Sequence, residues 1–214
     1  RLAEIYFAQD RNKEVEKILR KQLEENPNNA HALMGSVRLA TKRKDFDAAR
    51  AYLGRAREAG VPAQELALQE AFLLAVQGKK DEAESLLQDL LRQDKKLLSA
   101  WEMLVNLQIA ARDVNALQRT IYNLEGLDLS RGFLHAYASG HRAMLQGDAE
   151  GIARHFEQAL VFQPENVRLL QFMVRLDMFL GRSDIAERRT RKLLQVDSDN
   201  RVGNFFMSNF QIQR

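Results

Sequence analysis

The sequence predicts an all-α fold in which helical hairpins stack one on the next. A polar turn signal recurs about every 34 residues along the chain. Small and aliphatic residues after each turn keep the spacing of a single helix face. With 214 residues, 45% of them hydrophobic and 29% charged, the chain is long and apolar enough to bury a sizeable core.

The turn signal keeps its register at six places. Each is a short polar stretch followed by a small or aliphatic residue, and successive stretches lie 34 or 35 residues apart. They begin at Asp10, Lys44, Gly78, Arg112, Gly147 and Gly181. Glycine at three of these places suits the end of one helix. Asp45, Asp81 and Asp184 suit the start of the next helix, where a carboxylate complements the helix dipole.

The stretch around Lys44 shows how one hairpin is laid out. A first helix is expected from about Ala30 to Lys42. After the turn, Ala49, Leu53 and Ala56 fall at i, i+4 and i+7, one face of a second helix. In several repeats the second helix ends near a proline: Pro27, Pro62 and Pro164.

The period divides the chain into repeats that we expect to form one solenoid domain, 1–214. The predicted boundaries are 1–29 (partial), 30–63, 64–97, 98–132, 133–166, 167–200 and 201–214 (partial). One hairpin cannot bury its apolar face alone, so neighbouring hairpins must build the core together. Because the first residue is Arg1 and not Met, we expect a segment of a longer protein.

A hairpin of this length and pattern resembles the tetratricopeptide repeat (TPR) family. The residues at family positions are Tyr6, Pro27, Ala49, Ala56, Ala83, Trp101, Leu104, Gly140, Phe156, Ala159, Pro164 and Ala186. No single repeat is complete; Val105, for example, replaces the family's glycine. The resemblance implies a right-handed TPR superhelix (α-solenoid) of about six helical hairpins plus a terminal helix, closest to bacterial proteins. It also implies a concave surface lined by the first helices.

The sequence offers no enzymatic motif, so we expect a non-catalytic protein without catalytic residues, metal or cofactor. There is no cysteine, no His-Glu-x-x-His, no glycine-rich phosphate loop and no Gly-x-Ser-x-Gly. None of the four histidines stands three or four residues from another, which removes the helical spacing of a metal site.

Two basic runs, Lys42-Arg43-Lys44 and Arg188-Arg189-Arg191-Lys192, are better interpreted as solvated faces than as a nucleic-acid surface. The net charge is only +3, and few aromatic residues interleave with the second run. No apolar run approaches the ~20 residues of a membrane span, so direct membrane contact is not expected. The compartment stays open between the cytoplasm and the bacterial periplasm or envelope.

The resemblance implies that five positions of each repeat face the concave groove. The predicted peptide-binding residues are Arg38, Leu68, Phe72, Asn106, Tyr137, His141, Met144, Arg175 and Met178. Family members that clamp a peptide carboxylate use Lys, Asn and Arg there, and only Asn106 matches. The predicted partner is therefore an apolar or amphipathic protein segment. Phe179 belongs to the same predicted groove. The alternative is that four of these side chains are core residues that pack between hairpins: Met144, Leu145, Met178 and Phe179.

The tail predicts self-association, because Phe205, Phe206 and Phe210 crowd one short helix. That apolar face would pack either on a further repeat or on a second copy, making a homodimer. The leading functional hypothesis is a protein-interaction scaffold, with a role in bacterial secretion, envelope or exopolysaccharide assembly suggested by the family. The alternatives are a structural spacer within a larger multidomain protein, and a repeat segment that serves an enzyme domain outside this sequence.

Overall fold

A computed structural model describes residues 6–7, 11–127 and 132–212 of the chain. Within these ranges the regular structure is helical throughout, with twelve helices, α2 to α13, and no strand. The turn signal predicted at Asp10 lies outside the described residues. The predicted all-α fold is confirmed.

The chain divides into two compact units, Arg1–Leu107 and Gln108–Arg214, with the boundary inside α7. The predicted single domain and its repeat boundaries therefore stay predictions. The first unit holds α2 (Asn12–Glu25), α3 (Ala30–Lys42), α4 (Phe46–Glu58), α5 (Ala63–Val76), α6 (Lys80–Gln93) and most of α7 (Leu98–Ala110). The second unit holds α8 (Val114–Gly126), α9 (Phe133–Gln146), α10 (Ala149–Phe162), α11 (Val167–Phe179), α12 (Ser183–Val196) and α13 (Arg201–Ile212).

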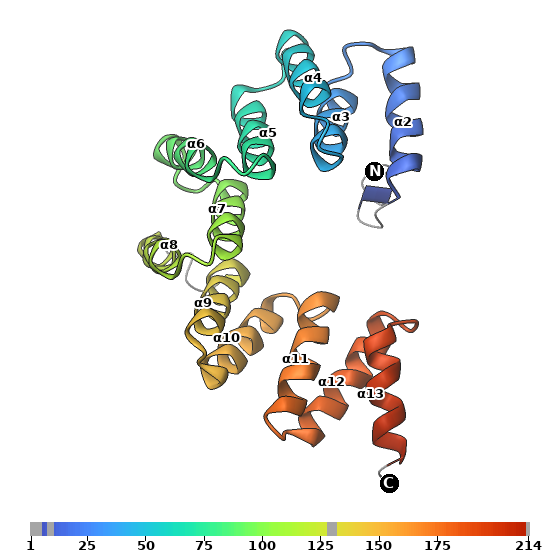
Figure 1. Ribbon diagram of the computed structural model, residues 1–214, viewed down its shortest axis with the longest axis vertical. Coiled ribbons are helices and arrows are strands. Elements are labelled where there is room, and N and C mark those ends of the chain that lie inside the picture. Colours follow the sequence, from blue (N-terminus) through green and yellow to red (C-terminus); the bar gives the residue numbers. More distant parts are fainter. Residues whose placement is uncertain (1–5, 8–10, 128–131, 213–214) are drawn as a thin grey trace. The chain divides into compact units, whose positions relative to one another are not determined.

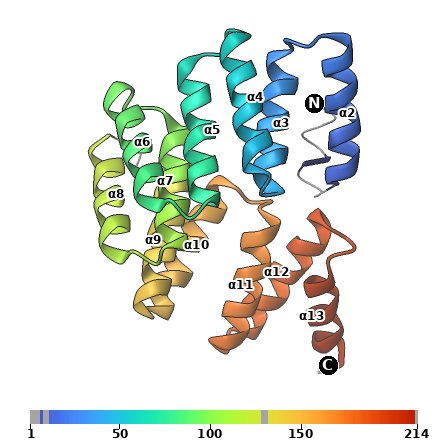
Figure 2. The same cartoon turned by 45° about the horizontal axis from the view of Figure 1, so that its top comes forward.

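Consecutive helices pair as hairpins within each unit. Figures 1 and 2 show α3 beside α4 and α11 beside α12, and the α5–α6 and α9–α10 pairs are packed in the same way. Helix α3 spans Ala30–Lys42, as the sequence predicts. Contact also passes from one hairpin to the next, from α3 to α5 and from α10 to α11, so each hairpin covers the apolar side of its neighbour.

Each turn inside a hairpin that the structure describes contains one residue with left-handed backbone. These residues are Lys44 (φ 61°), Gly78 (φ 80°), Arg112 (φ 55°), Gly147 (φ 74°) and Gly181 (φ 71°). They are the first residues of the stretches by which the sequence period is recognised. The repeat signal therefore marks the position at which the backbone adopts the left-handed conformation. At two of these five positions, Lys44 and Arg112, the residue is not glycine.

Side-chain caps fix where many of the helices begin. Asp45, Asp113 and Asp148 each accept a hydrogen bond from the backbone N–H three residues on, at 2.9–3.1 Å. Asn29 and Asn166 cap the first helices α3 and α11 in the same way. Asp81 and Asp184 lie in the first turns of α6 and α12, where they complement the helix dipole without capping.

Small residues allow the helices of the first unit to approach closely. Ala49 and Ala56 on α4 are fully buried, as the predicted helix face requires. Ala32 on α3 is also fully buried, and it packs with Val15 and Leu19 of α2. The tryptophan of α7, Trp101, is buried and donates its indole N–H to the carbonyl of Lys95 at 2.9 Å.

In the described part of the second unit, four helices share a continuous core. It joins residues of α9, α10, α11 and the inner face of α12, with Phe156 and Met173 at its centre, each 1% exposed. Phe156 reaches this position because α9 carries Gly140 opposite it, and a Cβ at Gly140 would overlap the ring. This aromatic–glycine pair occupies two of the positions on which the family resemblance is based.

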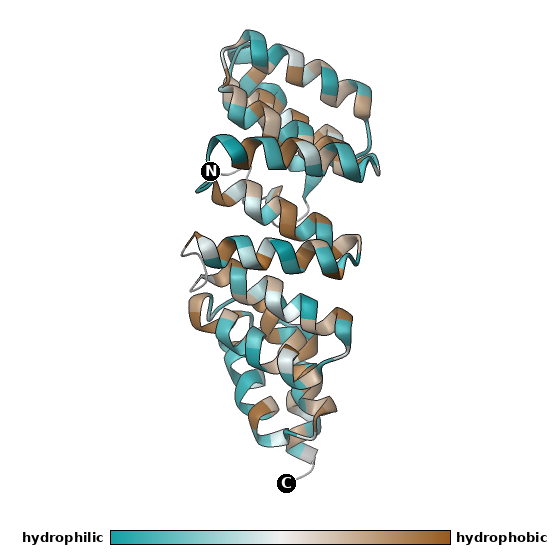
Figure 3. Cartoon of the chain, turned by 90° about the vertical axis from the view of Figure 1, so that its left-hand side faces the viewer, coloured by the Kyte–Doolittle hydropathy of each residue, from teal (hydrophilic) through white to brown (hydrophobic). Residues whose placement is uncertain are grey.

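Polar and apolar residues alternate along the helices, as expected for helices with one buried face. Figure 3 shows both colours on successive turns of the helices in each unit. Among the described residues no helix has the combination of length and apolar character that crossing a bilayer requires.

Candidate functional site

The predicted groove residues of the first unit lie on its first helices, α3, α5 and α7. Arg38 and Asn106 are exposed, whereas Leu68 and Phe72 are half-buried on α5. The guanidinium of Arg38 lies over the ring of Phe7, 4.9 Å from its centroid. Helices α3 and α5 are in contact, so the first unit offers two half-exposed apolar residues on α5 and an exposed cation on the neighbouring helix α3.

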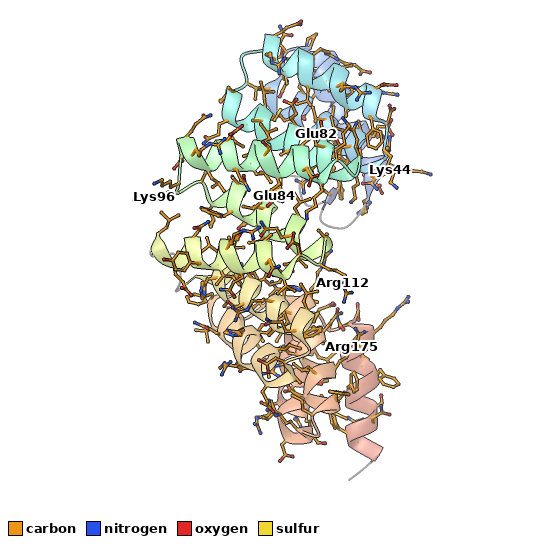
Figure 4. All side chains as sticks on the ribbon, turned by 60° about the vertical axis from the view of Figure 1, so that its left-hand side comes forward. Lys44, Glu82, Glu84, Lys96, Arg112 and Arg175 are labelled. Carbon is orange, nitrogen blue, oxygen red and sulfur yellow. The ribbon has the colours of Figure 1, made fainter. Side chains whose placement is uncertain are left out.

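The predicted groove residues of the second unit lie on α9 and α11. Tyr137, His141 and Met144 of α9 are half-buried, as is Met178 of α11. Arg175 of α11 is exposed and is labelled in Figure 4. Met144 and Met178 are thus neither fully enclosed nor fully open, and part of Met144 packs against the core.

Aromatic rings connect this face of α9 to the core beneath it. Phe133 stacks on Tyr137 with centroids 5.3 Å apart, and Tyr137 meets His141 edge to face at 4.5 Å. His141 in turn contacts Phe156 edge to face at 5.2 Å. Phe156 meets Phe172 of α11 at the same distance. Such contacts hold the rings in defined positions, so the face is a preorganised apolar surface.

Burial keeps the polar groups of these rings uncharged. It raises the pKa of the Tyr137 hydroxyl, an effect that nearby Arg168 partly opposes. Burial also lowers the pKa of His141 below its ordinary value of 6.5. At neutral pH the α9 face is therefore neutral and apolar, with cationic Arg168 and Arg175 on α11.

Two further aromatic residues of α11 belong with this set: Phe179, which the sequence predicts in the groove, and Phe172, which it does not. Phe172 is half-buried beside Phe156, and Phe179 is 81% exposed. Phe179 follows Arg175 by four residues, so the two share one face of α11. The exposure of Phe179 shows that its alternative interpretation as a core residue is wrong.

The predicted self-association surface on α13 is smaller than expected. Phe205 is 62% exposed and meets Phe206 edge to face at 5.2 Å. Phe210 is only 7% exposed, so its assignment to an exposed face was wrong. The helix turns this residue inward as α13 packs on α12, where Gly203 approaches Leu194 closely.

A second concave feature, which the sequence did not indicate, lies on the second helices. A cavity of about 660 Å³ is bounded by α10 and α12, with α11 as its floor. Its walls combine apolar residues with charged ones, including part of the basic run that begins at Arg188. Across the described ranges, no cluster of three or more His, Cys, Asp or Glu residues is arranged to hold a metal ion.

Comparison with known proteins identifies the repeat. Residues 6–69 match the tetratricopeptide repeat family. The chain is also similar in fold to solved structures of low sequence identity, so the resemblance to TPR proteins is confirmed. A search of the curated proteins finds no match to this sequence.

Three of the similar structures show the range of proteins that use this fold. PilW, a widely conserved type IV pilus biogenesis factor, is 13% identical with a TM-score of 0.62, over 95% of this chain and 94% of its own. PilF of Pseudomonas aeruginosa is 14% identical with a TM-score of 0.54, over 100% and 95%. Yeast Tom70 is 14% identical with a TM-score of 0.73, over 94% of this chain and 43% of its own.

Proposed function

We propose that this chain is a non-catalytic scaffold that binds an apolar or amphipathic segment of another protein on its first helices. The observation that carries the proposal is the half-exposed aromatic surface of α9 and α11. Tyr137 and Phe172 are fixed by ring contacts yet keep part of their surface open. Rigid, partly exposed aromatic residues and methionines are typical anchors of protein interfaces.

The charges around this surface favour a partner with some acidic character. Arg168 and Arg175 on α11 are exposed, and the described structure shows no ion pair for either of them. In the first unit Arg38 borders Phe7 in a similar way. An apolar segment with a few carboxylates would fit both features. A pure spacer would have no need for an ordered aromatic surface, which is why the scaffold is preferred.

The known structures support an assembly role without naming a partner. PilW is a pilus biogenesis factor, and PilF of Pseudomonas aeruginosa has the same fold. The similarity to these two structures is compatible with a bacterial origin for this chain and with a role in secretion or envelope assembly. A homodimer would form through exposed Phe205 and half-buried Phe206. Comparison of the solution mass of a Phe205→Ser variant with that of the native chain tests this contact.

The binding surface is tested by replacing aromatic residues that keep part of their surface exposed. Phe72→Ala and Tyr137→Ala should each weaken capture of the native partner by about tenfold, since an interface anchor is worth roughly 1–2 kcal/mol or more. Tyr122→Ala, which removes an aromatic residue that is 71% exposed on the second helix α8, serves as control. Full binding by folded variants of both aromatic residues would contradict the proposal.

A further inference from the structure

The cavity on the second helices has an apolar floor. Leu160, Leu170 and Met173 face it and are themselves 1–8% exposed. Ile185 on α12 stands at its edge and is 36% exposed. With a volume of about 660 Å³, the cavity is within the size range of protein sites that bind ligands or side chains.

The charges that line this cavity do not balance. Five cationic residues and three carboxylates face it, which leaves a net charge of +2. All three carboxylates are already paired. Glu150 accepts from Arg182 at 2.5 Å, and Arg189 pairs with both Glu157 and Asp177. Asp177 and Arg189 are buried, so their pairing is part of the structure and is not open to a ligand.

Three cations remain, and they stand on both sides of the floor. Arg154 projects from α10, whereas Arg188 and Lys192 project from α12 one helical turn apart. In the described part of the chain none of the three has an ion-pair partner. An apolar group that enters the cavity would therefore have positive charge on its two flanks.

The first unit contains a matching cavity that serves as an internal comparison. It lies between α2 and α4, has a volume of about 390 Å³, and is lined by three cations and three carboxylates. There Arg43 pairs with Glu16 at 2.8 Å, and Arg55 donates to the carbonyl of Pro27. The positive excess is thus a property of the α10–α12 cavity and not of the repeat fold.

We propose that the α10–α12 cavity binds an acidic amphipathic helix of a partner protein. Apolar side chains at i and i+3 or i+4 would cover the floor, and carboxylates on either side would meet Arg154 on one rim and Arg188 and Lys192 on the other. A single small anion fits less well, because the cations are spread along two helices over an apolar floor. This site is separate from the aromatic surface of α9 and α11.

The test measures binding of designed peptides to the full chain by fluorescence anisotropy. One labelled peptide is an amphipathic helix with leucines on one face and glutamates on the others, and its counterpart carries lysines in place of the glutamates. The acidic peptide should bind at least about tenfold more tightly than the basic one, and more weakly as salt is raised. No binding of the acidic peptide, or equal binding of both, overturns the proposal.

Charge-reversal variants locate the site. Arg188→Glu together with Lys192→Glu should weaken binding of the acidic peptide by about tenfold or more. The matched control, Lys17→Glu with Arg20→Glu on α2, should leave it unchanged. Circular dichroism verifies that each variant is folded. Two results would indicate a general attraction of polyanions and overturn the proposal. One is an equal loss of peptide binding in the two charge-reversal variants. The other is displacement of the peptide by an equal concentration of short polyuridine RNA.

Discussion

Gly140 on α9 determines how closely two helices of the second unit approach. Its position is opposite the Phe156 ring, and a methyl group there would overlap ring atoms that are almost fully buried. Gly140→Ala should therefore lower the free energy of unfolding by about 1–3 kcal/mol, because the core has no room to relax. Urea denaturation followed by circular dichroism measures this change.

Gly54 in α4 provides the matched control for that substitution. A Cβ at Gly54 would meet no atom within 4 Å, and the residue lies inside a helix. Gly54→Ala should raise the free energy of unfolding by up to about 1 kcal/mol, because alanine favours helix more than glycine does. If both substitutions changed stability in the same direction, the packing argument for Gly140 would fail.

His141 predicts how stability depends on pH. Burial among aromatic rings lowers its pKa below 6.5, whereas the unfolded chain keeps the ordinary value. The unfolded state therefore takes up a proton first as pH falls, and the free energy of unfolding decreases from about pH 7 downward. Thermal melts between pH 7 and pH 5 should show this loss of stability.

A His141→Gln variant separates this residue from the others that titrate. It should lose less stability than the native chain over the same pH range. Some pH dependence should remain, because burial also lowers the pKa of His155, together with the nearby positive charge of Arg154. Identical pH profiles for variant and native chain would show that His141 does not contribute.

The turn inside each hairpin is the element whose conformation the repeat preserves. At Lys44 and Arg112 a residue with a Cβ holds a left-handed backbone that costs about 1–2 kcal/mol, against a smaller entropic cost for glycine. Both side chains lie at hairpin ends in Figure 4, where Lys96 marks the opposite end of the first unit's helices. Lys44→Gly and Arg112→Gly should each stabilise the chain by about 0.5–1 kcal/mol.

Chemical denaturation of the two glycine variants tests this prediction. Gly78→Ala, made at the equivalent turn where φ is 80°, should be destabilising by a similar amount. A loss of stability in Lys44→Gly and Arg112→Gly would contradict the prediction. It would mean that the native side chains stabilise the fold by more than the left-handed backbone costs.

The helices were easier to predict from the sequence than the surfaces between them. Helix α3 was predicted with its observed bounds because the turn that begins at Lys44 marks its end, and the structure adds a second local signal, the Asn29 cap at its start. These signals are local, since each depends on residues within one turn of helix. The predicted binding residues are placed on the first helices, but their partial burial depends on neighbours such as Phe156, which no local pattern reveals.

The basic run on α12 shows why the cavity was not predicted. In sequence, Arg188, Arg189, Arg191 and Lys192 look alike. In the structure Arg189 is buried against Asp177 and Glu157, while Arg191 pairs with Glu187 at 2.6 Å. Only Arg188 and Lys192 are left to line the cavity as unpaired cations. The carboxylates that pair with Arg189 lie on other helices, and Glu157 is 32 residues earlier in the sequence. No pattern within the basic run itself could distinguish Arg189 from its neighbours.

At the scale of the whole molecule, stability should be divided among neighbouring hairpins. The helix contacts join elements that are next or next but one along the chain. Gly140→Ala should therefore reduce amide protection in α9 to α12 more than in α2 to α4. Hydrogen exchange measured by mass spectrometry tests this, and an equal loss of protection in both units would show that the chain unfolds as one body.

The five left-handed turns have a consequence for how such a chain can change over generations. Since each of these hairpins closes through the same backbone geometry with glycine, lysine or arginine, the turn residue can be substituted while the path of the chain is kept. The charge that each hairpin presents at this end can then diverge while the fold stays the same.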